Sequence, residues 1–203
     1  IVVFDIDDKV KEIISRANKE LNLNIKFVEH DLREPIPEEY REHFDCFLTD
    51  PPYTQNGLKL FVSRGLQLLS KTNNGVFYLS FGTKPPNEML AIQKDLTDMG
   101  CLITDVLPGF NEYIGAQKLG GISTMYRIIV GVNSSPLILE KYNGHLYTGD
   151  INPIIRTYIC MDCKTEYLIG KKQQFSTIEQ LKNHGCTKCK NTRFQKKSEK
   201  KME

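Results

Sequence analysis

The chain has 203 residues and a composition ordinary for a globular protein, with 40% hydrophobic and 26% charged residues. No apolar run approaches the ~18 residues that a membrane span needs, and no signal peptide is recognisable, so we expect a cytoplasmic protein without a membrane partner. Residues 150–203 carry 12 Lys and Arg against 6 Asp and Glu, whereas residues 1–149 carry 15 against 19. The acidic body suits a cationic substrate, and the basic end suits nucleic acid or is simply a solvated surface.

Short apolar runs alternate with amphipathic segments along the first two-thirds of the chain, in the pattern of strands that alternate with helices. Strands are predicted at 1–7, 25–31, 44–50, 75–81, 101–107 and 124–132, and helices at 9–21, 57–69 and 86–99. The pattern predicts an α/β fold, a Rossmann-like open and mostly parallel sheet with helices on both faces. The last two strands are predicted to form an antiparallel pair. Ligands of such sheets bind beyond the carboxyl ends of the strands.

The sequence begins at Ile1, inside the first predicted strand. We therefore expect an N-terminal part to precede it and to contain the central strand of the sheet. The predicted domains are a Rossmann-like domain over 1–149, lacking its first strand, and a cysteine-bearing segment with a basic tail over 150–203.

Acidic residues end three of the predicted strands, at Asp5 and Asp7, at Asp31, and at Asp50. Three acids at equivalent positions indicate a binding site, and the alternative is that they cap helices and solvate loops. Such an acid usually accepts hydrogen bonds from ribose hydroxyls, which fits Asp5, while Asp7 shares that role or caps a helix. Asp31 and the backbone N–H of Leu32 are placed to bind an adenine base. The layout is typical of class I transferases that use S-adenosylmethionine or a close relative.

The motif Asp50-Pro51-Pro52-Tyr53 follows the third predicted strand. The two prolines fix φ and remove two backbone donors, so Asp50 lies on a stiff turn. An aliphatic amine is mostly protonated at neutral pH, since it titrates near ~10 like lysine. A carboxylate is needed to hold the ammonium and then to accept its proton, which predicts Asp50 as a general base. Tyr53 offers a ring face to a cation or a base, or is an ordinary packing residue.

Four stretches of the chain together resemble one known family. They are "FDIDDKVKEII", "HDLREPIPEEYREHFDCFLTDPPY", "FVSRGLQLL" and "ITDVLPGFNEYIG", and they run in order from Ile1 to about Val132. They resemble the branched-chain polyamine synthases, the N(4)-bis(aminopropyl)spermidine synthases. The "FNEY" block at 110–113 is the most specific part, because methyltransferases that share Asp-Pro-Pro-Tyr have no reason to share it.

The resemblance implies an aminopropyltransferase that moves aminopropyl groups from decarboxylated S-adenosylmethionine to the internal secondary amine of spermidine. It implies that Asp50 is the base and that the donor is bound by Asp5, Asp7, Asp31 and Leu32. The polyamine site would comprise Asp50, Pro51, Tyr53, Asn111, Glu112 and Tyr113, and a homodimer is expected. The family motif reads Asp-Pro-Pro-Glu, so Tyr53 replaces an acid, and the Gly-Asp-Asp-Asp segment of the family would lie before Ile1.

Four cysteines near the C-terminus are spaced as two Cys-x2-Cys pairs, at Cys160, Cys163, Cys186 and Cys189. This spacing predicts a structural Zn²⁺ site in a zinc ribbon, with disulfides or inert thiols as alternatives. A cytosolic location disfavours disulfides. His184 is an alternative ligand or a surface residue. Three roles are open for the ribbon: dimer contacts, closure of one edge of the fold, or nucleic acid binding, which is not favoured. Nucleic acid would be bound through the basic residues Lys188, Lys190, Arg193, Lys196 and Lys197.

Two other functions agree with part of the sequence. An S-adenosylmethionine-dependent amine methyltransferase acting on nucleic acid or protein is favoured by Tyr53 and by the basic ribbon. A nucleotide-fold binding module without catalysis is the third alternative. The "FNEY" block and the acidic body favour the aminopropyltransferase.

Overall fold

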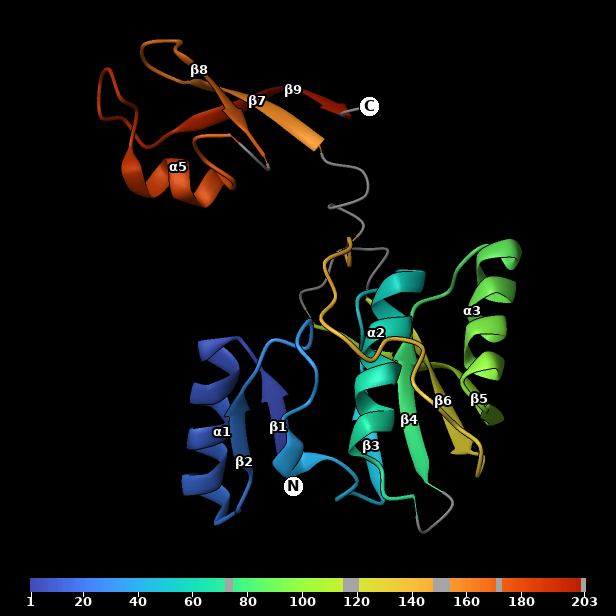
Figure 1. Ribbon diagram of the computed structural model, residues 1–203. Coiled ribbons are helices and arrows are strands. Elements are labelled where there is room, and N and C mark those ends of the chain that lie inside the picture. The colour runs from blue at the N-terminus through green and yellow to red at the C-terminus, as the bar shows by residue number, and fades with distance from the viewer. Residues whose placement is uncertain (72–74, 115–120, 148–153, 171–172, 202–203) are drawn as a thin grey trace. The chain divides into compact units, whose positions relative to one another are not determined.

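The structure is a computed structural model (Figure 1), and it describes residues 1–71, 75–114, 121–147, 154–170 and 173–201. These form two compact units, Ile1–Gly144 and His145–Glu203. The domain boundary predicted between 149 and 150 lies outside the described residues. Within the described ranges, every helix is too short or too polar to cross a lipid bilayer.

The described strands of the first unit form two sheets. One is the parallel pair of β1 (Val2–Asp5) and β2 (Lys26–Glu29). The other has the order β3-β4-β6-β5 and is built from β3 (Cys46–Thr49), β4 (Val76–Phe81), β5 (Cys101–Glu112) and β6 (Ile122–Val130). In this second sheet β3 and β4 are parallel, whereas β6 is antiparallel to both β4 and β5. The prediction is therefore confirmed in part: the β1–β2 and β3–β4 pairs are parallel and β5 and β6 form the predicted antiparallel pair, but β6 is also antiparallel to β4, so the four-stranded sheet is mixed.

Helices follow the strands in the predicted order, and polar caps fix where they begin. In α1 (Asp8–Leu21) the carboxylate of Asp7 accepts a hydrogen bond from the backbone N–H of Lys9 at 2.9 Å. In α2 (Gln55–Leu68) the Thr54 side chain is the cap. A 3₁₀ turn, η1, spans Glu38–Tyr40, and α3 spans Pro86–Asp98. Figure 1 shows α1 beside the β1–β2 pair, and α2 and α3 beside the four-stranded sheet.

The main core lies between the four-stranded sheet and the two helices beside it. Phe77, Leu79 and Phe81 of β4 are at most 1% exposed and pack with apolar side chains of α2 and α3. Side chains alternate along a strand, so their neighbours point to the opposite face. On that face Leu48 and Leu102 are 68% and 64% exposed. Among the described residues, helices therefore cover this sheet on one face, not on both as predicted.

The described part of the second unit is a small antiparallel sheet together with the helix α5. Its strand order is β8-β7-β9, with β7 at Ile154–Cys160, β8 at Glu166–Ile169 and β9 at Phe194–Lys201. The helix α5 spans Ile178–His184. The core of this unit is small and contains Tyr167, Ile169, Phe175 and Leu181 together with two of the cysteines.

Candidate active site and cysteine cluster

Asp50 directly follows β3, and a rigid turn leads from it into α2. Pro51 is buried, and the Thr54 hydroxyl accepts a hydrogen bond from the backbone N–H of Gly57 at 2.9 Å. A Cβ on Gly57 would lie 2.5 Å from the carbonyl oxygen of Pro52, so only glycine allows the helix to approach the turn this closely. The turn therefore fixes the backbone of Asp50, while its side chain remains exposed.

A group of hydroxyls meets Asp50 at this end of the sheet. Asp50 Oδ2 accepts a hydrogen bond from the Tyr113 hydroxyl at 2.8 Å. The Tyr113 oxygen also lies 2.6 Å from Ser80 Oγ and 3.3 Å from Ser123 Oγ, and the two serine oxygens are 2.8 Å apart. Asn111 Nδ2 donates to Ser80 at 3.1 Å and to Ser123 at 2.9 Å. We call Ser80, Asn111, Tyr113 and Ser123 the hydroxyl network.

The strand register brings these residues together. β5 shifts its register against β6 between Leu107 and Asn111, and Gly109 within this irregularity has a φ of 67°. Beyond the shift Asn111 pairs with Ser123, and the backbone N–H of Tyr113 bonds to the Gly121 carbonyl at 2.8 Å. Asn111 and Tyr113 are two residues apart and thus face the same side of the sheet, toward Asp50.

Tyr53 lies beside the network as a neutral phenol. Burial, together with the Tyr113 hydroxyl and the charge of Asp50, raises the pKa of Tyr53 to about 12, although the two serine hydroxyls oppose this. Its ring packs edge-on against Phe81 with the centroids 5.4 Å apart. Tyr53 is therefore both a packing residue and a neighbour of the carboxylate.

Glu112 lies between Asn111 and Tyr113 in the sequence but does not share their side of the strand. Its side chain is exposed, and it pairs in register with Ile122 of β6. Since side chains alternate along a strand, Glu112 points away from the network. Its assignment to the polyamine site stays a prediction.

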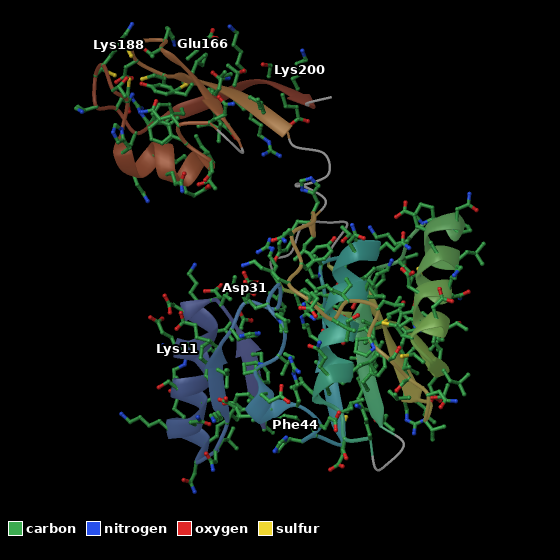
Figure 2. The ribbon with its side chains drawn as sticks, viewed as in Figure 1. Lys11, Asp31, Phe44, Glu166, Lys188 and Lys200 are labelled. Carbon is green, nitrogen blue, oxygen red and sulfur yellow. The ribbon has the colours of Figure 1, made fainter. Side chains whose placement is uncertain are left out.

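The acids predicted to bind the donor lie at the carboxyl ends of β1 and β2, where Asp5 is the last residue of β1. Because these strands are parallel, their carboxyl ends lie at the same edge, and Figure 2 shows Asp31 at the end toward which both strands run. The Asp5 carboxylate accepts hydrogen bonds from the backbone N–H groups of Ile6 and Asp7 at 2.7 and 2.9 Å. Asp31 accepts one from Arg33 N at 2.9 Å. One carboxylate oxygen of each acid thus shapes its own loop, and Asp7 is committed to capping α1.

A buried arginine, which the sequence analysis did not identify, holds the loop after Asp31. Arg64 of α2 is 1% exposed, and burial lowers its pKa. Its guanidinium donates to the backbone carbonyls of Leu32, Arg33, Ile138, Leu139 and Glu140, and to the side chain of Gln67. Leu32, which is predicted to contact the aminopropyl donor, is thereby fixed to α2 through a 2.9 Å hydrogen bond from Arg64 to its backbone carbonyl. The available signal was a charged residue within the apolar pattern of "FVSRGLQLL".

Ser80 and Ser123 were also missed. Both are nearly inaccessible, at 3% and 2% exposure, and lie on apolar strands. A small hydroxyl within a buried strand is a weak signal, because serine commonly bonds to nearby backbone. The strand register was needed to show that the two serines meet Asn111 and Tyr113.

The four cysteines of the second unit form one cluster. Their sulfur atoms lie within 4.8 Å of one another, with Cys160 and Cys189 3.5 Å apart and Cys163 and Cys186 3.4 Å apart. A tetrahedron with Zn–S bonds of about 2.3 Å has edges of about 3.8 Å, so the donor set fits this metal. His184 lies outside the cluster, with its ring nitrogen 2.8 Å from the Gly185 carbonyl.

The electrostatics of the cluster also suit a cation. Burial disfavours the Cys186 thiolate, but hydrogen bonds from Tyr167 and from backbone N–H groups outweigh it and lower the pKa to about 5. The Tyr167 hydroxyl lies 3.1 Å from the Cys186 sulfur. Although a backbone hydrogen bond at Asn191 lowers the pKa of Cys189, burial and the neighbouring sulfurs raise it to about 12. The hydrogen bonds at Cys186 thus favour the thiolate, which is the form that binds a metal ion.

Comparisons with known proteins match this chain to polyamine synthases. The family model of the branched-chain polyamine synthase A C-terminal domain matches residues 1–159. An uncharacterized protein of Methanocaldococcus jannaschii is 39% identical over 198 residues, covering 90% of this chain and 49% of that protein. The N(4)-bis(aminopropyl)spermidine synthase of the same organism is 38% identical over 117 residues, covering 56% of this chain and 33% of the relative. The chain thus spans between a third and a half of these relatives.

A solved structure agrees with these relatives. It is the crystal structure of the branched-chain polyamine synthase from Thermus thermophilus in complex with N4-aminopropylspermidine and 5′-methylthioadenosine. It is 26% identical, with a TM-score of 0.63, and the match covers 73% of this chain and 48% of that chain. The family predicted from the sequence is therefore confirmed, and this chain belongs to the branched-chain polyamine synthase A C-terminal domain family.

Proposed function

We propose that the full-length protein transfers aminopropyl groups from decarboxylated S-adenosylmethionine to the internal secondary amine of spermidine and so makes branched-chain polyamines. The observation that carries this proposal is the family match, which spans Asp50 and the whole hydroxyl network. The Thermus thermophilus relative supports it, because N4-aminopropylspermidine and 5′-methylthioadenosine are the two molecules that such a transfer releases.

The exposed Asp50 carboxylate suits the chemistry of this transfer. It first holds the protonated acceptor amine and then takes up its proton, which frees the nitrogen lone pair. The nitrogen attacks the carbon next to the sulfonium, the N–C bond forms, the C–S bond breaks, and 5′-methylthioadenosine leaves as a neutral thioether. The rigid turn at Pro51 and Pro52 keeps the carboxylate oriented for in-line attack.

The acceptor is a polycation, and charge pairing accounts for its binding. Spermidine carries about three positive charges, and each charge-assisted hydrogen bond to a carboxylate is worth roughly 1.5–3 kcal/mol. Three such contacts sum to about 4.5–9 kcal/mol, which corresponds to Kd values from roughly millimolar to micromolar. We assign Asp50 and the face of Tyr53 to this site, with Glu112 as the more distant acid.

We propose that the nucleoside of the donor is bound beyond β1 and β2. Asp5 would accept hydrogen bonds from the ribose hydroxyls, and Asp31 with the Leu32 N–H would bind the adenine. The support is that Asp5 ends β1 and Asp31 follows β2, and these two strands are adjacent and parallel. Asp7 contributes less, because its carboxylate already caps α1.

We propose that the cysteine cluster holds a structural Zn²⁺ through Cys160, Cys163, Cys186 and Cys189. The metal would cross-link the two Cys-x2-Cys turns and take no part in the transfer. Three of the five basic residues considered for nucleic acid binding form ion pairs with acidic neighbours, namely Lys196, Lys197 and Arg193. A fourth, Lys188, lies between two of the cysteines in the sequence and is labelled in Figure 2. These pairs weaken the case for nucleic acid, while a homodimer and a cytoplasmic location stay predictions.

The test is to incubate the full-length protein with each donor in turn. With decarboxylated S-adenosylmethionine and spermidine we expect 5′-methylthioadenosine and a polyamine heavier by one or more aminopropyl groups, measured by mass spectrometry. Asp50→Asn should abolish most of this product. The matched control is Asp45→Asn, because Asp45 is an exposed acid at the other end of β3. Release of S-adenosylhomocysteine with RNA or protein, and no reaction with spermidine, would favour the amine methyltransferase instead.

A further inference from the structure

We propose that Tyr113 is a positioning residue for the base. In this proposal the hydroxyl network holds Asp50 through its Oδ2 atom, so that Oδ1 alone receives the proton of the acceptor amine. The inference rests on the proposed function and deepens it. The sequence predicts that Asn111 and Tyr113 contact the polyamine directly, whereas here they orient Asp50. Ser80 and Ser123 become additional functional residues of the site.

The direction of the hydrogen bonds follows from the chemistry of the groups. An ionised carboxylate only accepts, so Tyr113 must give its single hydroxyl proton to Asp50, 2.8 Å away. The Tyr113 oxygen is then an acceptor, and Ser80 at 2.6 Å is its closest hydroxyl donor. With its proton committed to Tyr113, Ser80 accepts from Asn111 at 3.1 Å and from Ser123 at 2.8 Å. In this arrangement Asn111, Ser123 and Ser80 all donate toward Asp50. The Tyr53 hydroxyl is a further hydrogen-bond neighbour of Tyr113, Ser80 and Ser123.

The network cannot carry the substrate proton away. It ends at the amide of Asn111, which does not release a proton at neutral pH, and at the phenol of Tyr53, whose pKa is raised to about 12 by burial, the Tyr113 hydroxyl and the charge of Asp50. Ser80 and Ser123 are buried, so bulk water does not join the chain at these hydroxyls. The proton must therefore arrive and leave at the other carboxylate oxygen, and the exposure of Asp50 gives Oδ1 that access.

The parts of the network come from rigid elements. Ser80 lies on β4, Ser123 on β6 and Asn111 on β5, while Asp50 directly follows β3. A carboxylate that is hydrogen-bonded at one oxygen to a network on three paired strands cannot rotate freely. The direction in which its other oxygen points is therefore fixed before the substrate binds. Positioning of this kind lowers the barrier to proton transfer without binding the substrate more tightly. Loss of the Tyr113 hydroxyl should therefore act on turnover and not on affinity.

The test compares Tyr113→Phe with Tyr78→Phe in the full-length protein. Tyr78 is a partly exposed tyrosine on the same face of β4 as Ser80 and takes no part in the network, so it is a matched control. For Tyr113→Phe we expect kcat to fall roughly tenfold to a hundredfold, the loss expected for one hydrogen bond to a charged group. KM for both substrates should stay within about twofold, and Tyr78→Phe should behave as the wild type.

A double-mutant cycle separates positioning from general support of the fold. Ser80→Ala should lower kcat several-fold in the wild type, to roughly the extent of one neutral hydrogen bond. It should have little further effect in the Tyr113→Phe protein, because Ser80 acts through Tyr113. Equal losses in both backgrounds, or a Tyr113→Phe protein with a raised spermidine KM and normal kcat, would overturn the proposal. Wild-type protein inactive toward spermidine would instead refute the proposed function and this inference together.

Discussion

Replacing the buried Arg64 by methionine should strongly destabilise the first unit. Methionine fills a similar volume but leaves the carbonyls that the guanidinium satisfies without partners. The three shortest of these contacts, at 2.8 to 2.9 Å, go to Leu32, Ile138 and Glu140. They join α2 to two segments that are distant in sequence, so the substitution also loosens the loop proposed to contact the adenine.

The magnitude follows from the burial of the side chain and its contacts. A hydrogen bond to a charged group is worth about 1.5–3 kcal/mol, and removing one partner of a buried charged contact usually costs about 3–5 kcal/mol. Replacing Arg64 also removes the cost of burying its charge, which offsets part of the loss of several hydrogen bonds. We therefore expect the free energy of unfolding to fall by ~3–5 kcal/mol in total. For a protein of this size that corresponds to a fall of about 10 °C in the melting temperature.

The assay is thermal and urea unfolding of the full-length protein, combined with donor KM measurements. Arg64→Lys keeps the charge and up to three donors, so it should lie between the wild type and Arg64→Met. Arg16→Met is the control, because Arg16 is exposed on α1. If Arg64→Met melted within about 2 °C of the wild type, the carbonyls would not depend on the guanidinium and the reasoning would fail.

Three further predictions concern the turn, the base and the metal. Asp50→Asn should lower turnover by ~10²–10⁴ with donor binding nearly unchanged, measured by single-turnover kinetics and calorimetry, and normal turnover would exclude Asp50 as the base. Gly57→Ala should cost about 1–3 kcal/mol and lower kcat as well, because its Cβ would push on the Pro52 carbonyl, and unchanged unfolding would contradict this. Cys186→Ser should abolish bound zinc, measured by atomic emission, whereas Cys46→Ser should not. The pKa of Cys186 is lowered from 9.0 to about 5, so the stability that its thiolate contributes is complete above pH 9 and is lost as the pH falls to 5. The melting temperature of the metal-free protein should therefore fall over this pH range, and this fall should be absent in metal-free Cys186→Ser.

The sequence predicted the order and type of the elements in the first unit well, because local patterns carry that information. The helix expected at 57–69 is α2 at Gln55–Leu68, and the strand expected at 75–81 is β4 at Val76–Phe81. The antiparallel pairing of β6 with β4 was not predicted, since apolar runs do not state which strands pair. The strand predicted at 101–107 extends to Glu112, because the irregular pairing with β6 resumes at Asn111.

The grouping of residues at the candidate site could be predicted in part for the same reason, while the roles of these residues stay predictions. The motif at Asp50 and the block around Tyr113 are contiguous in sequence, and the structure joins them by a hydrogen bond. Glu112 was grouped with its neighbours because a sequence block does not show that strand neighbours face opposite ways. Ser80 and Arg64 are single polar residues in apolar stretches, and their roles depend on partners 31 or more residues away.

The two compact units differ in what keeps them folded. The first has a core of helices and strands, whereas the described residues of the second bury few apolar side chains besides two of its cysteines. A chelator should therefore melt the second unit alone, since a metal that cross-links a small core supplies much of its folding free energy. Calorimetry of the holoprotein after chelation should show one heat-absorption peak lost and another retained, and amide exchange should rise only within residues 145–203.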